Sequence, residues 1–213
     1  MLTTIELRWF YPGTIPTEIE EWFPQNCSPE QREDWYLYAQ KCDYLGIKLR
    51  QERLEVKWRK AELGVLNFGE LIEGKAEKWG KWMCSDSTGE SFQPATVFGN
   101  STWVNVQKIR RLQYYQILSD SSVQVVASNE SIDNSCAVEI TQLLIQEQSW
   151  WSLALEASGE DSHLPGNLQL TASWVFNNYQ GKKLIAASSY AYPHWLEMIL
   201  GNLAICPSSK TND

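Results

Sequence analysis

Most of this sequence alternates polar or charged residues with apolar ones, the pattern of β-strands whose two faces meet different surroundings. Between residues 4 and 10, Thr4, Glu6 and Arg8 alternate with large apolar residues. The same alternation predicts strands over residues 47–50, 54–59, 102–112, 137–145 and 149–157. Residues 51–53 predict a tight hairpin between two of these strands. A chain with this pattern must place one face of a sheet against an apolar core and the other against water or a polar interior.

Helical signals are fewer. Helical spacing or a proline near the start predicts helices over residues 16–23, 164–176 and 193–203. Ser28 before Pro29 is a further helix start signal, but the residues after it, 35–45, fit both a helix and a strand. The fold class is therefore α+β and β-dominated.

The chain has no Gly-, Pro- or Ser-rich linker that would divide it. We expect one domain over residues 1–205 and a loose tail over 206–213, with a long polar loop over 85–100. Residues 75–82, with three lysines and two tryptophans, predict a solvated strand, with a substrate-side strand or a lid as the alternative.

The apolar faces of the predicted strands carry tryptophans that need a cover. In an open sheet the charged face would simply be the solvent side. In a closed barrel, by contrast, the helices pack outside while the charged faces line a wet interior. We expect the closed barrel.

Composition excludes several classes of protein. The 213 residues carry a formal net charge of -8, which disfavours nucleic acid and anionic membranes as partners. The sequence shows no signal peptide or membrane-spanning run. The five cysteines form no Cys-x-x-Cys pair, as expected of reduced thiols. We therefore expect a cytoplasmic protein.

One segment reverses the overall charge. Residues 41–60 hold seven basic and three acidic residues. Lys48 and Arg50 project together from one strand, and Lys57 and Arg59 from the next, so the four cations would repel one another without a compensating anion. Phosphate oxygens suit such a set. A solvated strand face is the alternative. Carboxylates could also neutralise the cations, or hold a divalent metal; the candidates are Glu6, Glu55, Glu139 and Glu156.

Taken in order, these segments resemble the CYTH, or triphosphate tunnel, superfamily. Residues 4–8 look like a degenerate form of its Glu-x-Glu-x-Lys opening. The other similar segments are its second strand at 32–37, its basic hairpin at 45–50 and 54–59, its Lys-x-Arg strand at 108–110, its acidic strands at 136–140 and 152–156, and its C-terminal end at 188–190. The resemblance is piecemeal but covers most of residues 3 to 200.

The resemblance implies an eight-stranded antiparallel tunnel that grips a triphosphate, and relatives that hydrolyse triphosphates or cyclise ATP with Mg or Mn. It implies that the phosphate contacts are Arg8, Lys48, Arg50, Lys57, Arg59, Lys108 and Arg110, and that the metal ligands are Glu6, Glu139 and Glu156. The expected partner is a small phosphorylated anion, such as a polyphosphate or an organic triphosphate, and the chain could form a homodimer.

Thr4 and Ala154 stand where the family has acidic residues. The predicted phosphate contacts therefore match the family pattern better than the predicted metal ligands do. Two alternatives to a metal-dependent triphosphate hydrolase therefore stay open. One is a non-catalytic anion binder on the same barrel. The other is a lipocalin-like barrel for an apolar or pigment ligand, suggested by eleven tryptophans, among them Trp103, Trp150 and Trp151. The two histidines, His163 and His194, fit surface positions better than catalytic ones.

Overall fold

The computed structural model of the chain describes residues 1–50, 53–85, 102–127 and 134–201. The strands are β1 (Leu2–Pro12), β2 (Glu30–Leu37), β3 (Leu45–Arg50), β4 (Arg53–Phe68), β5 (Ile72–Ser85), β6 (Trp103–Ile117), β7 (Val123–Val126), β8 (Ser135–Ile145) and β9 (Gln148–Ser158). The helices are α1 (Thr17–Trp22), α2 (Leu164–Phe176) and α3 (Tyr192–Leu200), with a short 3-10 turn η2 (Ala186–Ser188).

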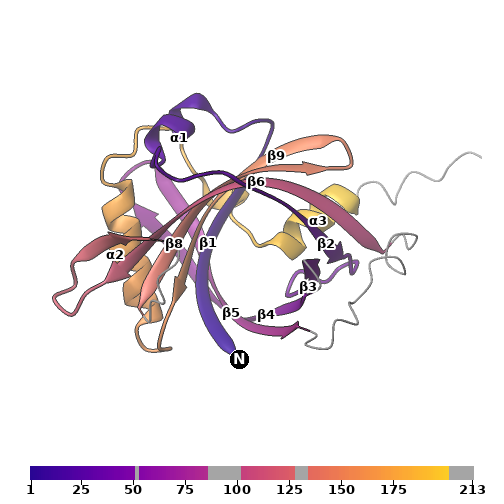
Figure 1. Cartoon of the computed structure of the whole chain (residues 1–213), viewed down its shortest axis with the longest axis horizontal. Coiled ribbons are helices and arrows are strands. Elements are labelled where there is room, and N and C mark those ends of the chain that lie inside the picture. Colours follow the sequence, from indigo (N-terminus) through magenta and orange to yellow (C-terminus); the bar gives the residue numbers. More distant parts are fainter. Residues whose placement is uncertain (51–52, 86–101, 128–133, 202–213) are drawn as a thin grey trace, which may run out of the picture.

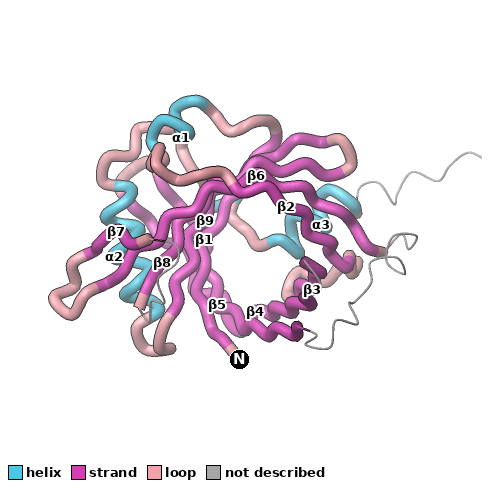
Figure 2. Tube along the Cα trace, viewed as in Figure 1, coloured by secondary structure: helices cyan, strands magenta, loops and turns pink. Residues whose placement is uncertain are grey.

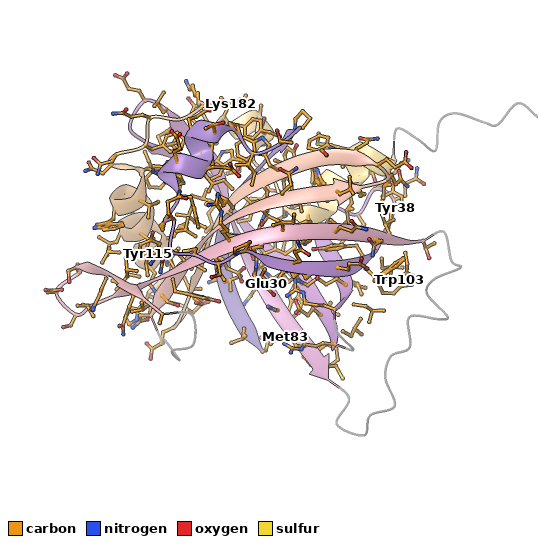
Figure 3. All side chains as sticks on the ribbon, turned by 45° about the horizontal axis from the view of Figure 1, so that its top comes forward. Glu30, Tyr38, Met83, Trp103, Tyr115 and Lys182 are labelled. Atoms are coloured by element: carbon orange, nitrogen blue, oxygen red, sulfur yellow. The ribbon has the colours of Figure 1, made fainter. Side chains whose placement is uncertain are left out.

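Eight strands form a closed antiparallel barrel. Their order is β2-β3-β4-β5-β1-β9-β8-β6, and β6 pairs again with β2 to close the ring, while β7 extends β6 outside it (Figures 1 and 2). At the closing seam Glu30 faces Arg110 and Leu37 faces Trp103; in Figure 3 Glu30 lies at one end of this strand pair and Trp103 at the other. The predicted β-dominated α+β barrel is confirmed.

The apolar faces of the strands pack outward against α1 and α2, which lie together on one side of the ring (Figure 1). The residues Ile5, Leu7 and Trp9 of β1 are at most 2% exposed there. Helix α2 adds Leu168 and Ala172 to the same cluster. This outer core explains why alternate positions of β1 are large and apolar, and it leaves the charged positions facing inward.

A second apolar cluster fills one end of the barrel. The buried Trp195 of helix α3 packs against Phe10 of β1 and Trp150 of β9, in a cluster that also takes in side chains of β2, β6 and β8; in Figure 2 the helix lies within the outline of the ring. Phe10 stacks on Trp195 with ring centroids 4.9 Å apart. Gly46 of β3 lies so close that a Cβ there would be 3.4 Å from Pro193. The helix therefore closes this end of the lumen.

The local predictions have mixed outcomes. The helix over 164–176 is confirmed with the same bounds, and the helix at 16–23 appears as α1. The helix start signal at Ser28 is wrong, because the residues after it form β2, which pairs with β3 and β6. The lid alternative for residues 75–82 is also wrong, because they belong to β5, which is paired on both sides.

Some expectations fall outside the described residues. They are the loop beyond residue 85, the turn residues 51 and 52, the end of the last helix beyond 201, and the tail at 206–213. The pairing of β3 with β4 still confirms the predicted basic hairpin, since Arg50 lies opposite Arg53. Among the described residues, none of the helices has the length and apolar character needed to cross a bilayer.

Candidate functional site: a cationic chamber in the barrel lumen

The barrel encloses a chamber of about 1070 Å³. It extends from Tyr192, at the start of the helix that closes one end, to Leu2 and the segment after β9. Strand alternation places one face of every barrel strand along it. Among the described residues, eight cationic side chains line it: Arg8, Arg32, Lys48, Arg50, Lys57, Lys81, Lys108 and Arg110. The described acidic side chains that line it are five: Glu6, Glu55, Glu139, Glu156 and Glu160.

One end of the chamber is organised by Asp34, which is fully buried. Its carboxylate accepts hydrogen bonds from Arg50 at 2.6 and 2.9 Å and lies 2.8 Å from the Lys108 ammonium. Burial alone would raise the pKa of Asp34, but Lys108 and Arg50 hold it well below its ordinary value. Lys108 also donates to the Tyr36 hydroxyl at 2.7 Å and lies 4.0 Å from the centroid of the Tyr192 ring.

Lys48 and Glu55 form the neighbouring pair on β3 and β4, with 2.8 Å between the charged atoms. The Glu55 carboxylate also lies 3.5 Å from the Arg50 guanidinium and 3.7 Å from the Lys81 ammonium, so one carboxylate pairs with three cations. Burial and the adjacent Arg50 lower the pKa of Lys48 to about 7. Burial alone would raise the pKa of Glu55, but these cations lower it to about 2.

Two arginines bind Glu139 of β8, and the charge of a third, Arg32, also acts on it. Arg8 donates to it at 3.0 Å and Arg110 at 3.2 Å. Burial disfavours the charged form of Glu139, yet Arg8, Arg110 and Arg32 together lower its pKa well below the ordinary value. Arg8 also lies 5.0 Å from the centroid of the Tyr192 ring. Glu139 therefore binds two guanidinium groups at once, and Arg110 also pairs with Glu30.

Two of these arginines keep unused donors. The Nε atoms of Arg8 and Arg32 are buried and have no hydrogen-bond partner. The side chain of Arg32 is only 8% exposed, and its contacts with Glu30 and Asp34 are both 3.9 Å long. That is beyond hydrogen-bond distance. A buried donor without a partner costs about 1–3 kcal/mol, so this arrangement favours an additional acceptor in the chamber.

A row of glutamates crosses three adjacent strands on the same wall as Arg8, and two of them, Glu6 and Glu156, line the chamber. Glu77, Glu6 and Glu156 lie opposite one another on β5, β1 and β9. Lys57 pairs with both Glu6 and Glu156, and Arg59 pairs with Glu77 at 3.0 Å. The two alternating cations of β4 thus compensate part of the charge of these three glutamates.

The structure brings nine of the ten residues predicted for the site to the chamber wall. The exception is Arg59, which does not line the chamber and is held by Asp43, Glu62 and Glu77. Trp103, Trp150 and Trp151 do not line it either: Trp150 packs on Trp195, and Trp151 stacks on Tyr11 in the outer core.

Sequence reasoning gave no site role to three residues that line the chamber, Arg32, Lys81 and Tyr192, or to Asp34, which binds Lys108 and Arg50. Arg32 and Asp34 lie two residues apart in segment 32–37, which resembles the family's second strand, but that resemblance assigned neither of them to the site. Tyr192 reaches the chamber only because α3 enters the barrel end, which no local pattern in the sequence indicates.

The three predicted metal ligands do not fit a divalent metal in this arrangement. Glu139 is bound by arginines, while Glu6 and Glu156 share the Lys57 ammonium. Within the part of the chain that the structure describes, no group of three or more His, Cys, Asp or Glu side chains could hold a metal ion. Thr4 and Ala154 face the same lumen and supply no carboxylate.

No family model matches the chain, and no curated protein matches it. Among solved structures it is similar to the structure of PH1819 protein from Pyrococcus horikoshii OT3, with 12% sequence identity and a TM-score of 0.43. That match covers 93% of this chain and 99% of the other. A TM-score this low carries no inference about function.

Proposed function

We propose that the barrel binds a small, phosphate-rich anion, such as a polyphosphate or an organic triphosphate, in its lumen. The observation that carries this proposal is that two arginines of the chamber, Arg8 and Arg32, have buried Nε donors without a partner, while Arg110 lies beside Arg8 on Glu139. A guanidinium presents its donors in a planar fork that matches phosphate oxygens. A bound phosphate would satisfy those donors and balance the positive charge.

The shape of the lumen also supports a small anion. Eight described cations from six strands face one enclosed volume, so a compact ligand could contact several of them at once. An apolar or pigment ligand is less well supported, because the apolar part of the lumen is already filled by α3. About half of the described residues that line the chamber are charged.

The residues themselves account for binding and orientation. Arg8, Arg32 and Arg110 would hold phosphate oxygens, and the ring of Tyr192 would support Arg8 from the α3 side. Glu139 fixes Arg8 and Arg110 in place before the ligand arrives, which reduces the entropy cost of binding. No step of hydrolysis is assigned to any residue, because the carboxylates that the family would use for a metal are paired with cations.

The test is titration calorimetry with tripolyphosphate on the wild type, Arg32→Gln and Arg111→Gln. Arg32→Gln should weaken binding by about tenfold or more, since a hydrogen bond to a charged group contributes about 1.5–3 kcal/mol. Arg111 is the matched control, because it pairs with Glu20 and lies against Phe23 on the outer side of the barrel. Equal affinity in the wild type and Arg32→Gln would contradict the proposal.

A screen of tripolyphosphate, thiamine triphosphate and nucleotides, with and without Mn²⁺, would identify the preferred ligand. Release of phosphate would identify the hydrolase that the CYTH resemblance implies. Binding without release would identify the non-catalytic anion binder.

A further inference from the structure

The position of Lys57 distinguishes this lumen from one built around a metal. Glu6 and Glu156 lie directly opposite each other on β1 and β9. Their side chains leave the same face of the sheet, with Cβ atoms about 4.5–5.5 Å apart, so two ionised carboxylates there would repel. The ammonium of Lys57, from β4, forms a close ion pair with Glu6 and lies 3.3 Å from Glu156.

The electrostatics agree with a cation held between two carboxylates. Burial alone would lower the pKa of Lys57, but Glu156 and Glu6 together raise it above the ordinary lysine value. Burial likewise opposes ionisation of Glu156, yet Lys57 leads the cations that lower its pKa. One ammonium therefore faces two carboxylates, and it compensates their charge only in part.

Paired carboxylates on adjacent strands are also what a hard divalent cation requires. Such an ion would have to lie between the same oxygens that now contact the ammonium. Lys57 is tethered to β4 beside them, at an effective concentration that a dissolved ion does not reach. A second cation in that space would also be repelled by the ammonium.

We propose that Lys57 is the built-in cation of this lumen, that it takes the position between Glu6 and Glu156 which a divalent metal would need, and that the chamber binds its anion without a metal. Removal of the ammonium would expose a latent metal site made of the two glutamates. The part of this inference that concerns anion binding rests on the proposed function; the part that concerns metal binding does not.

The first experiment measures Mn²⁺ binding, without any anion, to the wild type, Lys57→Met and Lys60→Met. Methionine is close to lysine in length and carries no charge. Lys60 is the matched control on the same strand, because it is exposed and contacts the Thr3 hydroxyl. Lys57→Met should bind Mn²⁺ at least about tenfold more tightly than the wild type, because the competing buried charge is gone. Lys60→Met should behave like the wild type, and adding Glu156→Gln to Lys57→Met should abolish the gain.

Two results would overturn the inference. One is saturable Mn²⁺ binding by the wild type that Glu6→Gln or Glu156→Gln removes. The other is no gain in Lys57→Met that circular dichroism shows to be folded. If Lys57→Met does not fold, Lys57→Gln replaces it, and the wild-type titration with Glu6→Gln remains decisive on its own.

The second experiment measures tripolyphosphate binding to the wild type in EDTA and in Mn²⁺. Unchanged affinity supports the inference, and binding that requires Mn²⁺ overturns it. If tripolyphosphate does not bind in either condition, the proposed function fails, while the Mn²⁺ titration still decides the role of Lys57.

Discussion

At the scale of single residues, the chamber works through charges that only partly compensate each other. Asp34, Glu55 and Glu139 each form ion pairs with two or more cations. These pairs reduce the repulsion among the lysines and arginines of the chamber. The crowding of positive charge also lowers the pKa of a lysine. Burial, with the nearby charge of Arg50, lowers the pKa of Lys48 to about 7.

This shift predicts a pH dependence of anion binding. As the pH rises through about 7, Lys48 loses its proton and the chamber loses a positive charge. Tripolyphosphate affinity should therefore fall more steeply between pH 6 and pH 9 in the wild type than in Lys48→Met, as measured by calorimetry. The variant keeps Glu55 paired with Arg50 and Lys81. Parallel profiles in the two proteins would contradict the assignment.

The same shift has a definite sign for stability. An unfolded lysine keeps its proton up to about pH 10.4, so between about pH 7 and that value the unfolded chain binds more protons at this position than the folded chain does. The contribution of Lys48 to the free energy of unfolding should therefore rise with pH across this window.

At the scale of the elements, β5 shows how the wall of the barrel is fitted to its neighbours. A Cβ on Gly74 would lie 2.3 Å from the ring of Trp9 and 3.0 Å from Leu7. Trp9 is fully buried and donates its indole N–H to the Glu73 carbonyl at 2.8 Å. The glycine is therefore required by the tryptophan that packs against it.

We predict that Gly74→Ala lowers the free energy of unfolding by about 2 kcal/mol, because overpacking a core forces its neighbours to shift. Gly166→Ala in α2 is the control, since no heavy atom lies within 4 Å of a Cβ there. Alanine favours a helix over glycine by about 0.8–1 kcal/mol, so this variant should be unchanged or more stable. Urea denaturation measures both, and equal stability of Gly74→Ala and the wild type would contradict this account.

Several elements could be predicted from the sequence because their signal is local. The alternation in β1, β8 and β9 and the helical spacing in α2 each survive in the structure. Other features depend on distant contacts. The start of β2 carries a helix signal at Ser28 that pairing with β3 and β6 overrides. The turn between β8 and β9 uses Gln146 and Glu147 with positive φ, where the usual glycine or asparagine signal is missing.

The site divides in the same way. The alternation predicts that Lys48, Arg50 and Lys57 lie on one face of the sheet, and all three line the chamber. It could not show that Arg59, two residues beyond Lys57, lies outside the chamber, where Asp43, Glu62 and Glu77 hold it. Whether a cation faces a ligand or a carboxylate depends on how β4 pairs with β5 and on the nearby Asp43, and the spacing of the cations carries no information about either.

At the scale of the whole molecule, positive charge is concentrated in the chamber while the chain as a whole is negative. The chain carries a net charge of -8, yet cations outnumber acidic groups among the described residues that line the chamber. A large polyanion would meet mostly acidic surface, whereas a small one could enter the lumen. The expectation that the partner is a small anion rather than nucleic acid is consistent with this distribution of charge and stays a prediction.

The most direct test of the central claim is a crystal structure of the protein grown with tripolyphosphate in EDTA. The account predicts phosphate density in the lumen, with oxygen atoms within hydrogen-bond distance of Arg8, Arg32 and Arg110, and Lys57 still between Glu6 and Glu156. An unchanged lumen at saturating tripolyphosphate, or phosphate bound only to the outer surface, would contradict it.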